Sequence, residues 1–250
     1  MIAFETDAEG GWKYRCSCRH TLDVKYDAAH SQADIRRSEI LDFGNGGFLL
    51  HNILTPTECA SIIDGGEKIG FESIHAIRHI YRGSQRITIE SQSLADLLWT
   101  RVQPYLEELD IPCDSRSQHV HGVVKDKWVP VGVNKSFGLI RYNPIGHFAP
   151  QFDWIEQNSE HRSMRTLMVH LNGDFLGGST NFVGDIETLF TDGTGTCSAR
   201  EEDSLFTIQP ESGMAIIYDH GCLVEGQKPG GDKTYILRTV LMYKRQQGQN

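Results

Sequence analysis

The sequence lacks features that would place it in several other classes of protein. Among its 250 residues no stretch of 18 consecutive apolar residues occurs, so we expect no transmembrane segment. Lysine and arginine number 24 against 33 aspartate and glutamate, and the cations are scattered, so we expect no nucleic-acid partner. No segment repeats at a fixed period, and hydrophobic residues make up 39% of the chain. These values favour a globular domain over a solenoid or a disordered chain.

Cysteine is also sparse. The six cysteines are too widely spread for the disulfide framework of a small secreted domain, so we expect an intracellular, reducing compartment. The sequence does not distinguish the cytoplasm from mitochondria. The first residues, MIAFETDAEGG, carry acids where a signal or transit peptide carries basic and apolar residues, which indicates a protein that is not secreted. Cys16, Cys18 and His20 could contribute to a zinc site, but no second pair matches them, and an ordinary terminal segment is the favoured interpretation.

The first part of the chain predicts an extension followed by helices. Residues 1–44 are polar, with weak strand character at WKYRC and TLDVKY, and we interpret them as an N-terminal extension that lies on the main body. After a short apolar strand, Thr55 and Glu58 form a capping-box pattern that begins a helix, and Gly65 with Gly66 are expected to end it. Residues 93–109 place apolar side chains on one helical face, and a proline near the end of that segment should kink or terminate it.

From Trp128 onward the pattern changes to short β-type runs separated by Gly, Asn, Asp and Pro. The expected strands are FGLIRY, RTLMVHLN, TNFV, SLFTI, MAIIYD and TYILRTVLMY. We therefore expect an all-β half behind a helical half. Residues 183–203, rich in Gly, Thr and acids, are expected to form a long surface loop, either a lid or a contact surface.

Seven segments in a fixed order carry a family resemblance. They are FLL to ECASII, WVPVGVN, RYNPIGHFAPQFD, RTLMVHLN, GGSTNF, PESGMAIIYDH, and VEGQ followed by YILRTVLMY. In this order they resemble the prolyl 4-hydroxylase-like branch of the 2-oxoglutarate and Fe(II)-dependent oxygenases. The resemblance implies a mainly β fold with α, in which a double-stranded β-helix (jelly roll) at 128–244 is supported by helices within 45–127. It makes 45–250 one domain.

The resemblance also locates a metal site, and this sequence departs from the family there. Family members hold Fe(II) with His-x-Asp on one strand and a second histidine further along the chain. Here the first motif reads Gln151-Phe152-Asp153, and the place of the second histidine, counted back from Tyr235, is Val224. An amide oxygen is a poor ligand for Fe(II), and an isopropyl group is none. We therefore expect a degenerate site reduced to Asp153, with neither Fe(II) nor 2-oxoglutarate retained as a cofactor.

The 2-oxoglutarate positions that the resemblance implies are partly changed as well. The lysine that pairs with the far carboxylate in the family is replaced by Thr234, and the adjacent Lys233 should point to the opposite face of its strand. Arg238 is in phase with Thr234 and could still supply a cation. Tyr142 and Thr180 match positions that line the pocket. These last three residues are the candidate remnant of an acid-binding site.

Three hypotheses follow. The first is a catalytically inactive oxygenase fold that acts as a structural or interaction subunit of a larger protein assembly, with no catalytic residue. The second is an active oxygenase with an atypical metal site, for which His147, His170 and His220 are the available histidines, although surface or core roles are favoured for them. The third is a module that senses a dicarboxylate. The 1–44 extension and the 183–203 loop are the expected contact surfaces.

Overall fold

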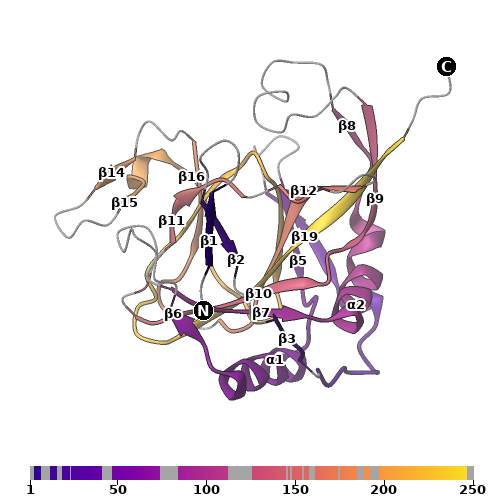
Figure 1. Cartoon of the computed structure of the whole chain (residues 1–250), viewed down its shortest axis with the longest axis horizontal. Helices are drawn as coiled ribbons and strands as arrows, with labels where there is room; N and C mark the ends of the chain where they lie inside the picture. The colour runs from indigo at the N-terminus through magenta and orange to yellow at the C-terminus, as the bar shows by residue number, and fades with distance from the viewer. Residues whose placement is uncertain are drawn as a thin grey trace.

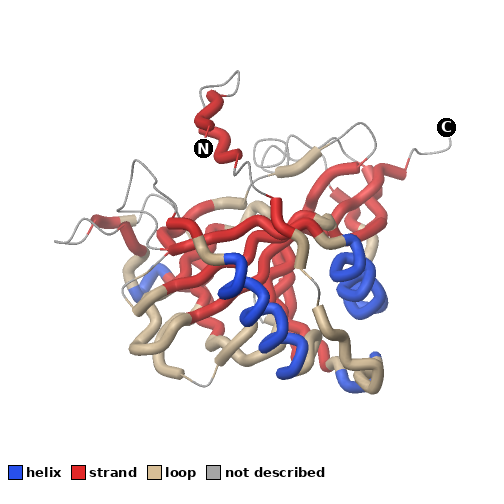
Figure 2. The backbone as a smooth tube through the Cα atoms, turned by 60° about the horizontal axis from the view of Figure 1, so that its bottom comes forward, coloured by secondary structure: helices blue, strands red, loops and turns tan. Residues whose placement is uncertain are grey.

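The computed structural model describes residues 3–6, 12–15, 19–22, 24–40, 47–73, 84–111, 126–144, 146, 148–153, 155–157, 161–173, 175–184, 189–191 and 197–246. Within them the chain is mainly β, with two α-helices, α1 (Pro56–Ile69) and α2 (Gln92–Val102). Neither described helix is long and apolar enough to span a bilayer. The helices lie on the outside of the β-structure (Figures 1 and 2).

One large sheet forms the wall on which the helices pack. Its strands run in the order β3-β7-β10-β19-β12-β17-β5-β4, with β6, β8 and β9 attached at its side. The bounds are β3 (Arg19–His20), β4 (Arg36–Glu39), β5 (Gly47–His51), β6 (Glu72–Ser73), β7 (Ser84–Glu90), β8 (Leu109–Ile111), β9 (Asp126–Val133), β10 (Ser136–Tyr142), β12 (His161–His170), β17 (Ala215–Asp219) and β19 (Thr234–Gln246). The long strands β12 and β19 pair antiparallel at its centre.

A smaller sheet faces the large one. It has the order β11-β18-β13-β16, with bounds β11 (Phe148–Gln151), β18 (Leu223–Gly226), β13 (Thr180–Val183) and β16 (Ser204–Ile208). Two short pairs stand apart, β1 (Ala3–Thr6) with β2 (Trp12–Arg15) and β14 (Phe190–Thr191) with β15 (Cys197–Ser198). The 3-10 turns are η1 (Gln32–Asp34), η2 (Gln103–Tyr105) and η4 (Glu201–Asp203).

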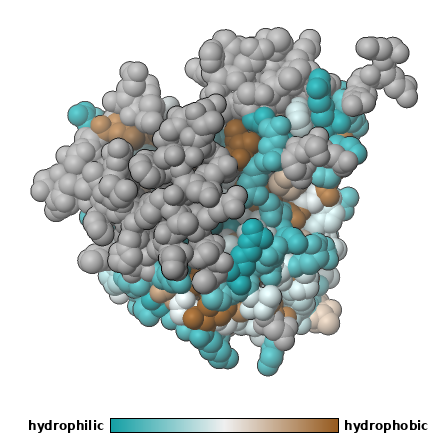
Figure 3. Space-filling view, in the orientation of Figure 1, coloured by the Kyte–Doolittle hydropathy of each residue, from teal (hydrophilic) through white to brown (hydrophobic). Residues whose placement is uncertain are grey.

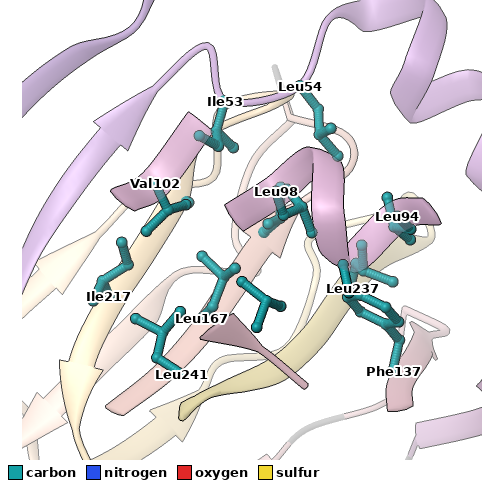
Figure 4. Close-up of a cluster of buried hydrophobic side chains, with 14 of the residues drawn as sticks. Ile53, Leu54, Leu94, Leu98, Val102, Phe137, Leu167, Ile217, Leu237 and Leu241 are labelled. Carbon is teal, nitrogen blue, oxygen red and sulfur yellow. The ribbon is translucent and has the colours of Figure 1, made fainter. Parts of the chain in front are cut away.

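Strand alternation divides the buried apolar side chains of the described residues between two hydrophobic clusters. On β19, Leu237 and Leu241 face the helices, whereas Ile236 faces the space between the sheets. In the helix-side cluster, Leu94, Leu98 and Val102 of α2 point toward apolar side chains of β10, β12 and β19 (Figure 4). The inner cluster joins both sheets: Ile140, Tyr142, Met168, Phe182, Ile208, Met214, Ile216, Tyr218, Val224 and Ile236. The inner cluster contains Tyr142 and Val224, two of the positions that the sequence resemblance predicts for the 2-oxoglutarate and metal site.

The helix predictions are confirmed in position, with one correction. Helix α2 and the turn η2, which contains Pro104, occupy the segment expected to be a proline-terminated helix. Helix α1 begins at the Thr55 cap but continues through Gly65 and Gly66 and ends at Gly70, whose φ is 90°. The expectation that the two glycines end the helix is wrong because they serve close packing. A Cβ at Gly65 would lie 2.1 Å from Leu22 Cδ1, and one at Gly66 would lie 2.4 Å from Leu139 Cδ2.

The division into a helical half and an all-β half also needs correction. Strands β5 and β7, from the first half, belong to the large sheet and pair with β17 and β10 of the second half. Within the 1–44 segment, β3 pairs with β7 and β4 with β5, so residues 19–39 add two strands to that sheet. The described residues of TLDVKY are not strand. The 183–203 segment, expected to be a long loop, contains β14, β15 and η4. Its positions 185–188 and 192–196 lie outside the described residues.

Candidate functional site

Strand pairing brings together Gln151 and Val224, the two positions at which the sequence resemblance predicts the family's histidines. Gln151 ends β11 and lies directly opposite Val224 of β18, so their side chains share the inner face. Val224 is 3% exposed and belongs to the inner hydrophobic cluster. The Gln151 amide donates to the carbonyl of Ala149 at 3.3 Å. Gln151 and Val224, which lie far apart in the sequence, therefore place an amide and a hydrocarbon side chain next to each other on the inner face of the small sheet.

Asp153, the remaining candidate ligand, is bound to protein groups at both carboxylate oxygens. Its side chain is 3% exposed, and Oδ1 forms an ion pair with Nη2 of Arg238. Oδ2 accepts a hydrogen bond from the Thr166 hydroxyl of β12. Arg238 comes from β19, where it lies opposite Met168 on one side and Gly138 on the other. The sequence placed Asp153 and Arg238 in two different subsites, and the structure joins them as one pair.

The candidate 2-oxoglutarate residues line one small inner hollow. Tyr142, Thr180 and Arg238 all border it, together with Val224. Its volume is about 20 Å³. A hollow of about 10–15 Å³ is needed to hold one water, so this space is of the order of a single water molecule. The three residues do converge, but on a space much smaller than a five-carbon dicarboxylate.

Thr234 stands where the sequence resemblance predicts the family lysine. Thr234 is fully buried opposite Tyr142, and its hydroxyl has no hydrogen-bond partner among the described residues. The neighbouring Lys233 has a side chain that is 51% exposed and lies 3.6 Å from Glu67 of α1. The prediction that Lys233 points outward is confirmed.

The described histidines do not gather at the site. His170 is completely buried at the end of β12, with Nε2 3.4 Å from the Thr180 hydroxyl. Burial lowers its pKa from 6.5 to about 4, so the ring is neutral at physiological pH. His220 is 2% exposed. Among the described residues no cluster of three His, Cys, Asp or Glu could hold a metal. His147, Cys16 and Cys18 lie outside the described residues.

A larger cavity, which the sequence did not indicate, shares Ile140 and Arg238 with the inner hollow. Its volume is about 490 Å³, within the range of small-molecule sites. The lining is largely polar: Ser84, Arg86, Ser136, Gly138, Ile140, Gln151, Phe152, Asp153, Glu156, Thr166, Arg238, Thr239 and Val240. The Arg86 guanidinium lies over Gly138, where a Cβ would be 2.9 Å from Nε. The period-2 pattern of SQRITIE in β7 could have indicated the strand that carries Arg86, but not the cavity.

The face of the molecule drawn in Figure 3 is mixed in character. Where residues are coloured, hydrophilic areas dominate and the hydrophobic areas are small and separate (Figure 3). The exposed large hydrophobic residues of the described chain are Tyr26, Val131, Phe152, Leu176 and Leu205. Leu176 is the most exposed of them at 84%, on the loop between β12 and β13.

Comparison with known proteins supports the fold. No protein-family model and no curated protein sequence matches the chain. Among solved structures, OsALKBH1 is similar with a TM-score of 0.52 at 11% identity, covering 84% of this chain and 100% of that one. Viral collagen prolyl hydroxylase from Paramecium bursaria Chlorella virus-1 gives 0.49 at 16% identity, with 82% and 99% covered. A 2OG-Fe(II) oxygenase family oxidoreductase from Burkholderia pseudomallei gives 0.41 at 12% identity, with 92% and 97% covered.

Of these three likenesses, the one to OsALKBH1 has a TM-score above 0.5, and it concerns the fold. The two facing sheets agree with the mainly β fold that the sequence resemblance predicts. At 11% identity this likeness leaves the activity open.

Proposed function

We propose that the chain is a catalytically inactive, prolyl 4-hydroxylase-like protein whose double-stranded β-helix serves as a structural or interaction subunit of a larger protein assembly. The observation that carries the proposal is the pairing of Asp153 with Arg238. The one carboxylate left from the family's ligand set is already neutralised by a cation of the protein itself.

The residues at the site do not fit an Fe(II) centre. Ferrous ion in this fold requires two imidazole nitrogens and a carboxylate with open positions beside them. Gln151 supplies an amide and Val224 a hydrocarbon, and both oxygens of Asp153 already have partners. A metal ion would have to displace a guanidinium from a buried carboxylate without gaining any nitrogen ligand in return. This is the physical basis for expecting no oxidation chemistry.

The space for the co-substrate supports the same proposal. The hollow between Tyr142, Thr180 and Arg238 is about 20 Å³, and apolar side chains of the inner cluster occupy the surrounding volume. Thr234 offers a hydroxyl where the far carboxylate would need a cation. Accommodating 2-oxoglutarate there would require displacing packed side chains, which is costly in a close-packed interior.

An interaction role is supported by the scaffold that surrounds the changed site. The capping box of α1, the ion pair of Glu58 with Arg101, and the helix-side cluster are complete without any bound group. A fold that keeps this framework while its reactive positions are replaced still offers a stable surface to which a partner protein can bind. The exposed Leu176 lies on a loop held in place by the hydrogen bond from Gly230 N–H to the Leu176 carbonyl, 2.6 Å.

The proposal is tested by metal content and turnover of the purified full chain. The protein is incubated with Fe(II), ascorbate, 2-oxoglutarate and oxygen, and succinate is quantified beside elemental analysis for bound metal. We expect no succinate above a protein-free control and substoichiometric iron. Stoichiometric iron with succinate release would favour an active oxygenase with an atypical site and contradict the proposal. The interaction role is tested by mild affinity purification of the tagged chain, and recovery of the chain as an isolated monomer would count against it.

A second candidate, a module that binds a small acid, is favoured by the cavity of about 490 Å³ and the two arginines, Arg86 and Arg238, that line it. A ligand that binds only the folded state raises the unfolding temperature. A thermal shift produced by 2-oxoglutarate without metal would support this candidate. We expect no such shift if the protein is purely structural.

A further inference from the structure

We propose that Arg238 is the resident cation of the former metal site: its guanidinium holds the buried Asp153 carboxylate in place of a divalent ion and separates the inner hollow from the outer cavity. The inference deepens the proposed inactive role and rests on it for the identity of the ancestral site. The ion pair itself is independent of that role.

The first step of the argument is electrostatic. A carboxylate with 3% of its side chain exposed is stable in its charged form only when a cation and hydrogen-bond donors surround it. Arg238 provides the cation to Oδ1 and Thr166 provides a donor to Oδ2. Asp153 therefore needs no metal ion for its charge, and a metal would have to compete with the guanidinium for the same oxygen.

The second step is geometric. Val224 lies opposite Gln151, and Asp153 follows Gln151 by two residues, so the former ligand positions are close together on the inner surface. Arg238 borders both the hollow of about 20 Å³ and the cavity of about 490 Å³. Ile140 is the other residue that borders both spaces, so Arg238 is the charged side chain that they share.

The third step concerns the neighbours that make room for the guanidinium. Gly138 lies opposite Arg238 on β10, and the Arg86 guanidinium rests over the same glycine. A side chain at position 138 would meet Arg86 at 2.9 Å, so the glycine leaves space for both cations on one wall. Glu156 also lines the outer cavity and accepts a hydrogen bond from Asn134. Among the described residues that line the cavity, the formal charges of two acids and two arginines cancel.

The inference predicts that restoring the histidines is insufficient for metal binding unless Arg238 is also removed. The experiment compares the variant Gln151→His/Val224→His with the same variant carrying Arg238→Met. The matched control carries Lys233→Met instead, because Lys233 is the outward-facing cation of the same chain segment. Cobalt(II) is the probe, and its binding is followed by visible absorption and by titration calorimetry, so that no turnover is needed.

We expect the variant with Arg238→Met to bind one Co²⁺ at least about 10- to 100-fold more tightly than the two-histidine variant, a range typical of supporting contacts at metal sites. The Lys233→Met control should bind no better than the two-histidine variant. Equal affinity with and without Arg238 would overturn the inference, as would equal improvement from Lys233→Met.

A second measurement keeps the inference testable if the multiple variants fold poorly. Arg238→Met alone should lower the unfolding midpoint, and Arg238→Met/Asp153→Asn should recover most of the loss, because the uncompensated charge is then gone. A midpoint unchanged by Arg238→Met, or no recovery in the double variant, would overturn the inference. Succinate formation by the unmodified chain would instead overturn the proposed inactive role, so the two failures are distinguishable.

Discussion

Two carboxylate–arginine pairs lie on opposite sides of the large sheet, and they are enclosed to different degrees. Glu58 of α1 and Arg101 of α2 meet on the helix side, with N–O distances of 2.7 and 2.9 Å. Their side chains are 0% and 7% exposed. Asp153 and Arg238 meet between the sheets, with 3% and 23% exposed, and both border a cavity.

The difference separates a scaffold pair from a site pair. Glu58 also accepts backbone N–H groups of Thr55 and Asp27, so protein donors surround it completely. Asp153 has one guanidinium and one hydroxyl, and an opening lies beside it. The first pair joins two helices to the loop before α1, since Arg101 also donates to the Ile53 carbonyl at 2.9 Å. The second occupies the place where the family resemblance puts chemistry.

Breaking the scaffold pair should have the largest effect on stability. Arg101→Met leaves Glu58 as an uncompensated buried charge, and removing one partner of a buried pair costs about 3–5 kcal/mol in the free energy of unfolding. Arg19→Met is the control, because Arg19 is 65% exposed in its pair with Glu90 and should cost less than about 1 kcal/mol. Chemical denaturation measures both. Equal losses in the two variants would contradict the distinction.

The two sides of the sheet should also respond to pH in different windows. The folded pKa of His170 is about 4 because of burial, so between pH 6.5 and about 4 the unfolded chain binds a proton that the folded chain does not. Stability therefore falls as pH decreases through this window, by up to about 3 kcal/mol.

Burial alone would raise the pKa of Glu58, but Arg101 and the N–H groups of Thr55 and Asp27 lower it below 4.5. The stability from Glu58 is thus retained above pH 4.5 and lost below it.

Unfolding at a series of pH values separates these contributions. The slope between pH 6.5 and 5 should flatten in His170→Gln, which does not titrate, whatever its absolute stability. A slope that persists in His170→Gln would show that another group carries it.

Breaking the site pair should cost less than breaking the scaffold pair. Because Arg238 is partly exposed, solvent can screen the charge left on Asp153, and we expect a loss of about 2 kcal/mol for Arg238→Met, below the range for fully buried pairs. Chemical denaturation of Arg238→Met and Arg101→Met in parallel gives the two losses in the free energy of unfolding. A larger loss for Arg238→Met would reverse the assignment of scaffold and site.

The smallest effect on stability is expected at the surface. Leu176→Ser should change the free energy of unfolding by less than about 0.5 kcal/mol, since the side chain is 84% exposed. If this loop contacts a partner, proteins that co-purify with the unmodified chain should be lost from the variant. Retention of the same proteins would place the interface elsewhere on the chain.

Much of the fold could be predicted from local patterns. The expected strands TNFV and SLFTI coincide with β13 and β16, because each is a short β-prone run flanked by turn residues. Strand β7 was missed although SQRITIE is polar at every second position, and two of these polar residues, Ser84 and Arg86, line the larger cavity. Gly65 and Gly66 were misread because their role is contact with Leu22 and Leu139, which local sequence does not reveal.

The residues of the candidate site could be predicted from the sequence, but the contacts between their side chains could not. The resemblance identified Gln151, Asp153 and Val224, and the register of β11 with β18 places the first and last opposite each other. The pairing of Asp153 with Arg238 joins β19 of the large sheet to the segment that follows β11 of the small sheet, a long-range feature that no local spacing encodes. The cavity volumes depend on packing in the same way.

Titration of the unmodified protein with Co²⁺ in the presence of 2-oxoglutarate, followed by visible absorption, tests the central claim most directly. The account predicts no saturable absorption band, because Arg238 already neutralises Asp153 and neither Gln151 nor Val224 offers a nitrogen ligand. A band that saturates at one equivalent of cobalt would contradict it.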